Sequence, residues 1–94
     1  MSRKIKVAII DDSRTIRTLL RNIMADDEGV EVLWEASRPT EALRLLDTAQ
    51  PDVITLDLHM PEMNGVELLK AYIDKYPIPT VIISSLSKDE SPLV

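Results

Sequence analysis

The chain of 94 residues contains no cysteine, no phenylalanine and only two glycines. Without cysteine, neither a disulfide bond nor a thiolate metal site can form. Because one tryptophan and two tyrosines are its only aromatic residues, the chain must build its core from isoleucine, leucine and valine. No apolar run approaches the roughly 20 residues that span a bilayer. These absences exclude disulfide-stabilised scaffolds and cysteine-based metal sites, and they argue against a membrane protein.

The chain has fewer basic than acidic residues: 11 lysines and arginines and 16 aspartates and glutamates give a net charge of −5. This sign argues against a nucleic-acid surface, because phosphate backbones attract clustered lysine and arginine. The apolar run after the basic N-terminus stops at Asp11, too early for a signal peptide. We therefore expect one small cytoplasmic domain that docks on protein partners and binds neither nucleic acid nor membrane.

Four short segments rich in apolar and β-branched residues predict strands at residues 7–10, 30–34, 53–56 and 80–83. The second segment contains Glu31, is less uniformly apolar, and is expected at an edge of the sheet. The three segments between them carry apolar residues at helical spacing. Because strands and helices alternate, we predict an α/β fold with a parallel sheet and right-handed crossovers.

The three predicted helices have recognisable starts and ends. The first begins at Ser13 and ends before Gly29, which can adopt a left-handed conformation. The second opens at Pro39, and the third follows Asn64-Gly65, a strong turn signal. The predicted apolar faces consist, helix by helix, of Ile16, Leu19, Leu20, Ile23 and Met24; of Ala42, Leu45, Leu46 and Ala49; and of Val66, Leu69 and Ile73, widened by Leu68.

Polar side chains follow the predicted strands at equivalent places. Asp11 and Asp12 follow the first strand, Asp57 follows the third, and Ser84 and Ser85 follow the fourth. In open α/β sheets, ligands bind beyond the carboxyl ends of the strands, where the strand order reverses. If the sheet has the flavodoxin-like order 2-1-3-4, the first and third strands are neighbours and all three carboxylates converge.

Three converging carboxylates repel one another and need a cation. Oxygen ligands without histidine or cysteine favour a hard ion such as Mg²⁺. An aspartate at such a site can act as a nucleophile toward phosphorus and form an acyl phosphate, while a hydroxyl such as that of Ser84 donates to the phosphoryl group. This chemistry predicts a phosphoryl-accepting aspartate and a magnesium site at one end of the sheet.

Each of these residues also has a simpler interpretation. Asp12 could cap the helix that begins nearby, and Ser84 and Ser85 could serve only the loop. Against this stands their common position at three strand ends. The single histidine, His59, is interpreted as a loop residue at the rim of the site.

Three arginines, Arg14, Arg17 and Arg21, share one face of the first predicted helix. The simplest interpretation is a solvated face. A docking surface for a kinase or a partner domain is the alternative.

Two stretches of the chain resemble the signature sequences of response-regulator receiver domains. They are residues 7–13, which contain Asp11-Asp12, and residues 51–65, which contain Asp57. The resemblance implies a doubly wound, flavodoxin-like parallel sheet. It also implies that Asp57 accepts a phosphoryl group from a phosphohistidine on a sensor histidine kinase.

The same resemblance assigns roles to the surrounding residues. It implies that Mg²⁺ is held by Asp11, Asp12, Asp57 and the backbone carbonyl of His59. It further implies that Ser84 is the switch hydroxyl and that the amide of Ser85 contacts the phosphoryl group. No residue other than Asp57 is expected to be catalytic.

Residues 77–87 are similar to the fourth strand, and its serine-serine-leucine ending, of the receiver domain of the chemotaxis protein-glutamate methylesterase. In that subfamily the receiver restrains a separate esterase domain until phosphorylation releases it. The similarity implies an output domain or partner such as a methylesterase. The chain itself has no esterase domain and is not expected to be an enzyme.

A full receiver domain has a fifth strand that ends in a lysine, and two further helices, which the chain does not contain. The simplest interpretation is that residues 1–94 are the N-terminal, incomplete part of a receiver domain from a longer chain. If the molecule ends at Val94, the fourth strand leaves an apolar edge. We would then expect a dimer or segment exchange through that strand.

Two other functions compete with a phosphorylation switch. One is a pseudo-receiver that binds partners without phosphorylation, which the missing lysine favours and the complete acidic set opposes. The other is a phosphatase of the haloacid dehalogenase type with Asp57 as nucleophile. Such an enzyme needs a second aspartate two residues later, where this chain has His59.

Overall fold

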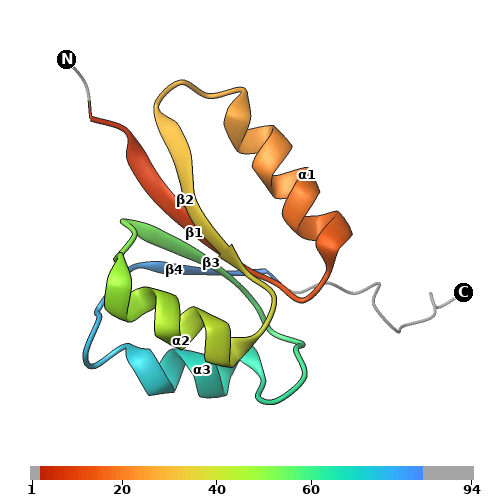
Figure 1. The fold of residues 1–94 in the computed structure, drawn as a ribbon, viewed down its shortest axis with the longest axis vertical. Coiled ribbons are helices and arrows are strands. Elements are labelled where there is room, and N and C mark those ends of the chain that lie inside the picture. The colour runs from red at the N-terminus through yellow and green to blue at the C-terminus, as the bar shows by residue number, and fades with distance from the viewer. Residues whose placement is uncertain (1–2, 84–94) are drawn as a thin grey trace, which may run out of the picture.

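The computed structural model describes residues 3–83, which form a parallel four-stranded sheet with helices on both faces (Figure 1). The strands are β1 (Ile5–Ile10), β2 (Val30–Ala36), β3 (Val53–Asp57) and β4 (Thr80–Ile83). The helices are α1 (Arg14–Ala25), α2 (Pro39–Thr48) and α3 (Gly65–Tyr72). Helix α1 covers one face of the sheet, and α2 and α3 cover the other. The alternating α/β architecture predicted from the sequence is confirmed.

The strand order is β2-β1-β3-β4, which confirms the predicted flavodoxin-like order and the edge position of β2. Strand β1 pairs with β2 on one side and with β3 on the other. The chain therefore winds outward in one direction from β1 and in the opposite direction from β3. The carboxyl ends of β1 and β3 lie side by side at the point where the order reverses, which is where such sheets bind ligands.

Within residues 3–83, β4 forms the second edge of the sheet. Val81 is 53% exposed and Ile82 is also exposed, as the sequence predicts for an apolar edge strand. An open edge offers backbone donors and acceptors to another strand. Association through β4 remains a prediction.

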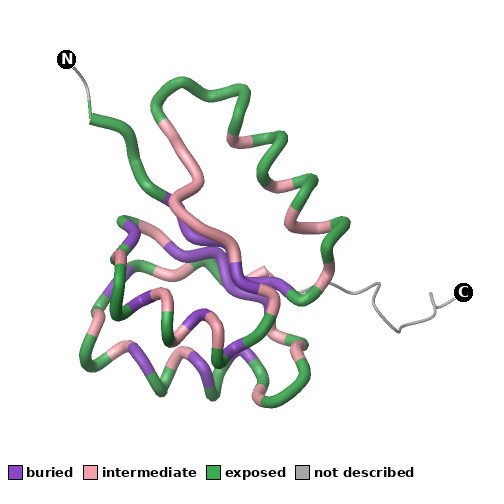
Figure 2. The backbone as a smooth tube through the Cα atoms, viewed as in Figure 1, coloured by how far each residue is buried: buried purple, intermediate pink, exposed green. Residues whose placement is uncertain are grey.

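The main core lies between the sheet and the α2/α3 layer (Figure 2). Strands β1 and β3 contribute one alternate set of side chains each, because successive residues of a strand point to opposite faces. The cluster consists of Ala8, Ile10, Ala36, Ala42, Leu46, Ile54, Leu56, Leu68, Tyr72 and Ile78. It is aliphatic apart from Tyr72, in agreement with the composition.

The predicted apolar face of α3 is correct for Leu68 and partly correct for Leu69 and Ile73, which pack half-buried against the core, but it includes the exposed Val66 and misses Tyr72. Leu68 and Tyr72 are its fully buried side chains, whereas Val66 is exposed and Leu69 is only half-buried. The helix begins at Gly65, which lies against the end of β3, and this contact rotates residues 68 and 72 toward the core. The sequence carries one apolar stripe with Val66, Leu69 and Ile73 and another with Leu68 and Tyr72, and it does not show which of the two is buried.

The predicted apolar face of α1 is present but is not buried. Ile16 and Leu20 are half-buried, and Leu19 and Ile23 are exposed. The helix packs on β2 and β1, and in the described part of the chain no second helix lies beside it on that face (Figure 1). A single helix on this face leaves part of its apolar stripe exposed to solvent.

Side-chain caps set the starts of α1 and α3, whereas α2 begins at Pro39 without one. Ser13 caps α1 by accepting from the amide of Ile16 at 3.2 Å. Asn64 and Glu67 form a reciprocal capping box at the start of α3, so Asn64-Gly65 begins a helix instead of a free turn. Gly29 does not adopt the left-handed conformation predicted for it. None of the helices in residues 3–83 is long and apolar enough to cross a bilayer.

Tyr72 links α3 to the start of β4. Its hydroxyl lies 2.6 Å from the hydroxyl of Thr80, which donates to the carbonyl of Ile78 at 2.9 Å. Burial raises the pKa of Tyr72, because the charged phenolate is poorly solvated in the core. The neutral phenol therefore stabilises the fold below its unfolded-state pKa, and this contribution is lost as the pH rises through the raised pKa.

We expect Tyr72→Phe to lower the free energy of unfolding by about 1 kcal/mol at neutral pH, the value of a typical hydrogen bond. The deficit should shrink at strongly alkaline pH, where the wild-type phenol ionises. Urea titrations followed by the fluorescence of Trp34, the only tryptophan, measure both values. The pKa of Tyr76 is also raised, chiefly by its hydrogen bond to Asp47. The comparison is therefore best made in a Tyr76→Phe background.

Candidate metal centre

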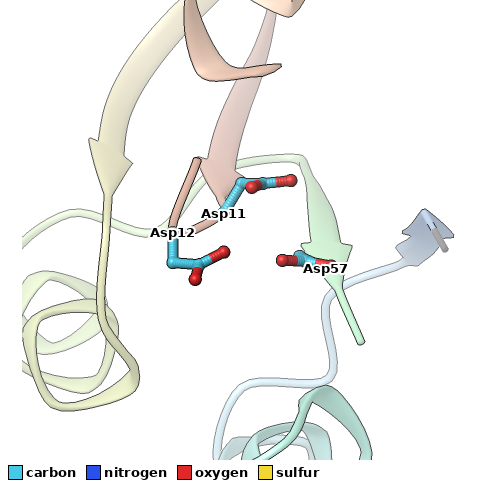
Figure 3. Close-up of side chains that lie close together, drawn as sticks. All are labelled: Asp11, Asp12 and Asp57. Carbon is cyan, nitrogen blue, oxygen red and sulfur yellow. The ribbon is translucent and has the colours of Figure 1, made fainter. Parts of the chain in front are cut away.

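Three carboxylates meet at the carboxyl ends of β1 and β3 (Figure 3). Asp11 and Asp12 follow the last residue of β1, and Asp57 is the last residue of β3. One carboxylate oxygen from each lies within 4.8 Å of the others. Asp11 and Asp57 are 2% and 1% exposed, whereas Asp12 is exposed. The convergence of these aspartates, predicted from their positions along the chain, is confirmed.

The backbone of Asp11 is held on two sides. Its amide donates to the carbonyl of Ala36 at the end of β2, at 3.0 Å. Its carbonyl accepts from Nη1 of Arg17 on α1, at 2.7 Å. Its carboxylate accepts from the amide of Ser13 at 2.8 Å. The turn from β1 into α1 therefore places Asp11 through contacts with two other elements. Asp12 does not cap the helix, because Ser13 occupies that position.

Asp57 is placed by the close approach of α3 to the end of β3. A Cβ atom built on Gly65 would lie 2.5 Å from the carbonyl oxygen of Asp57 and 3.0 Å from Cα of Leu58. The amide of Gly65 donates to the carbonyl of Leu58 at 2.9 Å, and Oδ1 of Asp57 accepts from the amide of His59 at 3.1 Å. Only glycine allows the helix to begin this close to the strand.

The loop between β3 and α3 is anchored to the start of α2. Glu62 adopts a φ of 76°, which is unfavourable for a residue with a side chain. Its carboxylate accepts from the hydroxyl of Thr40 at 3.2 Å and lies 3.8 Å from Arg38. These contacts help to keep the loop in place. His59 is exposed at the loop, as predicted for a rim residue.

The interpretation of Arg17 as part of a solvated face is wrong. The side chains of Arg17 and Glu35 are only 18% and 20% exposed, and Nε of Arg17 lies 3.4 Å from Oε1 of Glu35 on β2. Arg21 pairs with the other oxygen of the same carboxylate. Arg14 is exposed, as expected. No sequence pattern shows which strand faces α1, so the sequence did not reveal this ion pair.

The donor set fits a hard divalent cation. All three side chains offer carboxylate oxygens, which Mg²⁺ and Ca²⁺ prefer to nitrogen or sulfur. Two of the carboxylates are buried, where mutual repulsion is weakly screened and a cation is most favourable. Ser84 and Ser85, predicted to complete the site, lie outside the described residues.

Comparisons with known proteins identify relatives of the chain. Residues 7–94 match the response regulator receiver domain family. The protein-glutamate methylesterase/protein-glutamine glutaminase of Pyrococcus horikoshii is 42% identical over 89 residues, which cover 95% of this chain and 24% of the relative. The group 3 operon protein of the same name from Rhodopseudomonas palustris is 44% identical over 92 residues, which cover 98% of this chain and 25% of the relative. The chain thus spans about a quarter of these relatives.

Among solved structures, the response regulator domain of Thermotoga maritima CheB is similar with a TM-score of 0.84 at 36% identity, over 93% of this chain and 65% of that chain. The receiver domain of the Francisella response regulator 1452 is similar with a TM-score of 0.76 at 32% identity, over 92% and 70%. The predicted similarity to methylesterase receivers is confirmed. With the matching sheet order and the aspartates in place, the chain belongs to the response regulator receiver domain family.

Proposed function

We propose that Asp57 accepts a phosphoryl group from the phosphohistidine of a chemotaxis-type sensor histidine kinase. The observation that carries this proposal is the position of Asp57, 1% exposed at the end of β3 with Asp11 and Asp12 beside it. A carboxylate in such a place is costly unless a cation or a hydrogen-bond network compensates it. The carboxylate of Asp57 is therefore suited to act as a nucleophile at this site.

In the proposed transfer, a carboxylate oxygen of Asp57 attacks the phosphorus atom. A new O–P bond forms while the P–N bond to the kinase imidazole breaks, and its electron pair stays on the histidine nitrogen. The amide of His59 already donates to Oδ1 of Asp57, which orients the carboxylate. The closeness of α3 at Gly65 limits its backbone movement.

Asp11, Asp12 and Asp57, with the backbone carbonyl of His59, are the proposed Mg²⁺ ligands. When bound, Mg²⁺ neutralises negative charge on the transferring phosphoryl group. Ser84 is the proposed switch hydroxyl, and the amide of Ser85 the proposed phosphoryl contact. The similarity to methylesterases supports a methylesterase domain as the output under control. The receiver itself, as proposed, performs no esterase chemistry and acts in the cytoplasm with its kinase.

The test is intact mass spectrometry after incubation with Mg²⁺ and acetyl phosphate. We expect a single added phosphoryl group in the wild type, and none in Asp57→Asn or in wild type treated with EDTA. Asp52→Asn is the matched control, since Asp52 lies just before the other end of the same strand and is exposed. This variant should be labelled as the wild type is.

Three outcomes would redirect the proposal. Mg²⁺ binding without any added phosphate would favour a pseudo-receiver that binds partners only. Labelling that persists in Asp57→Asn would place the acceptor at another residue. A phosphatase with His59 in place of the second aspartate should turn over acetyl phosphate rapidly without accumulating the labelled form.

A further inference from the structure

We propose that Arg17 is a positioning residue for the metal site: it fixes the peptide between Asp11 and Asp12 and thereby the placement of both carboxylates. The proposal rests on the cation site proposed above. It does not depend on phosphoryl transfer.

The contact at issue is the hydrogen bond from Nη1 of Arg17 to the carbonyl oxygen of Asp11, at 2.7 Å. That carbonyl belongs to the peptide that joins Asp11 to Asp12. The plane of a peptide is rigid, so the direction of this C=O bond determines where the Asp12 backbone leaves the end of β1. Holding the carbonyl therefore sets the position of the exposed carboxylate relative to the buried one.

The guanidinium of Arg17 makes a second contact, with Glu35. Its Nε lies 3.4 Å from Oε1 of Glu35, and both side chains are about four-fifths buried. Glu35 immediately precedes Ala36, whose carbonyl accepts from the amide of Asp11. The end of β2 thus fixes Asp11 twice, directly through Ala36 and indirectly through Glu35 and Arg17.

Holding the peptide between Asp11 and Asp12 in place matters for metal binding. Three carboxylates within 4.8 Å repel one another, and Asp12, the exposed one, is the most able to move away by rotation of its preceding peptide. A cation would then have to pull Asp12 back before all three oxygens could bind it. A guanidinium that holds the peptide in place removes this cost in advance.

The charge of Arg17 acts in the opposite direction. A cation near the site disfavours a second cation, so removing Arg17 would strengthen metal binding if charge were its only effect. The proposal predicts weaker binding instead. The sign of the change therefore distinguishes positioning from simple electrostatics.

Arg21 provides the matched control. It lies one turn further along α1 and pairs with the same Glu35 carboxylate, at 2.7 Å from its Nε to Oε2. No hydrogen bond of Arg21 to Asp11 is found among the contacts of the described residues. Arg21→Met removes the same charge and an ion pair with the same partner, but leaves the Asp11 carbonyl held.

The experiment is a Mg²⁺ titration of the wild type, Arg17→Met, Arg17→Lys and Arg21→Met, followed by amide resonances in ¹H–¹⁵N spectra. We expect Arg17→Met to bind Mg²⁺ about tenfold more weakly, as is usual when a group that orients a metal ligand is lost. Arg17→Lys keeps the charge and one donor, and should lie between Arg17→Met and the wild type. Arg21→Met should stay within about twofold of the wild type.

A second readout uses the metal-free protein in EDTA. The Asp12 amide resonance should shift or broaden in Arg17→Met and remain unchanged in Arg21→Met. Equal or tighter Mg²⁺ binding by Arg17→Met would overturn the proposal, as would equal losses in both methionine variants. A wild type that binds no Mg²⁺ would overturn the metal site itself, whereas normal wild-type binding with an unaffected Arg17→Met would overturn only the role of Arg17.

Discussion

Gly65→Ala is expected to lower the free energy of unfolding by about 2 kcal/mol, the usual range for an overpacked site, and to slow phosphorylation of Asp57. The added Cβ would lie 2.5 Å from the carbonyl oxygen of Asp57 and 3.2 Å from its carbonyl carbon. Both atoms belong to the backbone of β3, so no side-chain rotation can relieve the overlap. Either α3 or the end of β3 must move, and the second movement displaces Asp57.

The same substitution at the other glycine is the control. A Cβ on Gly29 would meet only the side-chain oxygen Oδ1 of Asp27, at 3.3 Å, and Gly29 has no positive φ. Gly29→Ala should therefore change stability by well under 1 kcal/mol. Urea unfolding and acetyl phosphate labelling of both variants measure the two effects. If Gly65→Ala were as stable and as readily labelled as Gly29→Ala, the close approach of α3 to β3 would be wrong.

The sequence was most informative where the residues of a single strand indicate how far that strand is buried. The run Val7-Ala8-Ile9-Ile10 predicts a strand covered on both faces, and these residues are indeed buried in β1, an inner strand between β2 and β3. Ile5 and Lys6 extend β1 because they pair with the start of β2, a partnership that their own exposed side chains do not reveal. The observed order β2-β1-β3-β4 then brings Asp11 and Asp57 together as predicted.

Features that depend on contacts between elements were not predictable in the same way. The buried face of α3 depends on how Gly65 meets the end of β3, and the sequence offered two apolar stripes. Arg17 appeared to be a solvated side chain because its partners, Glu35 and the Asp11 carbonyl, are defined only once α1 lies against β2. The carboxylates of the site could be predicted from the sequence, but the contacts of Gly65 and Arg17 that position them could not.

Removing one carboxylate from the metal centre should stabilise the metal-free domain. Two unit charges no more than 4.8 Å apart repel by about 3.5 kcal/mol or more at an effective dielectric constant of 20. Asp57→Asn removes the repulsion from Asp11 and Asp12, and its amide oxygen can still accept from the amide of His59. After allowance for that weaker hydrogen bond and for screening at the exposed Asp12, we expect a gain of about 1–2 kcal/mol.

The gain should appear as a melting temperature about 5–10 °C higher in EDTA, given the size of the domain. Mg²⁺ should raise the melting temperature of the wild type substantially and that of Asp57→Asn much less, because the stabilisation by a ligand that binds only the folded state grows with the logarithm of its concentration relative to Kd. Asp52→Asn makes the same change in net charge away from the centre, where Asp52 accepts from the amide of Lys6, and should not stabilise the domain. Calorimetry of the three proteins with and without Mg²⁺ separates the effects. A metal-free Asp57→Asn that melts at or below the wild-type temperature would mean that contacts within the site already offset the repulsion between its carboxylates, so that no stability is given up to hold them together.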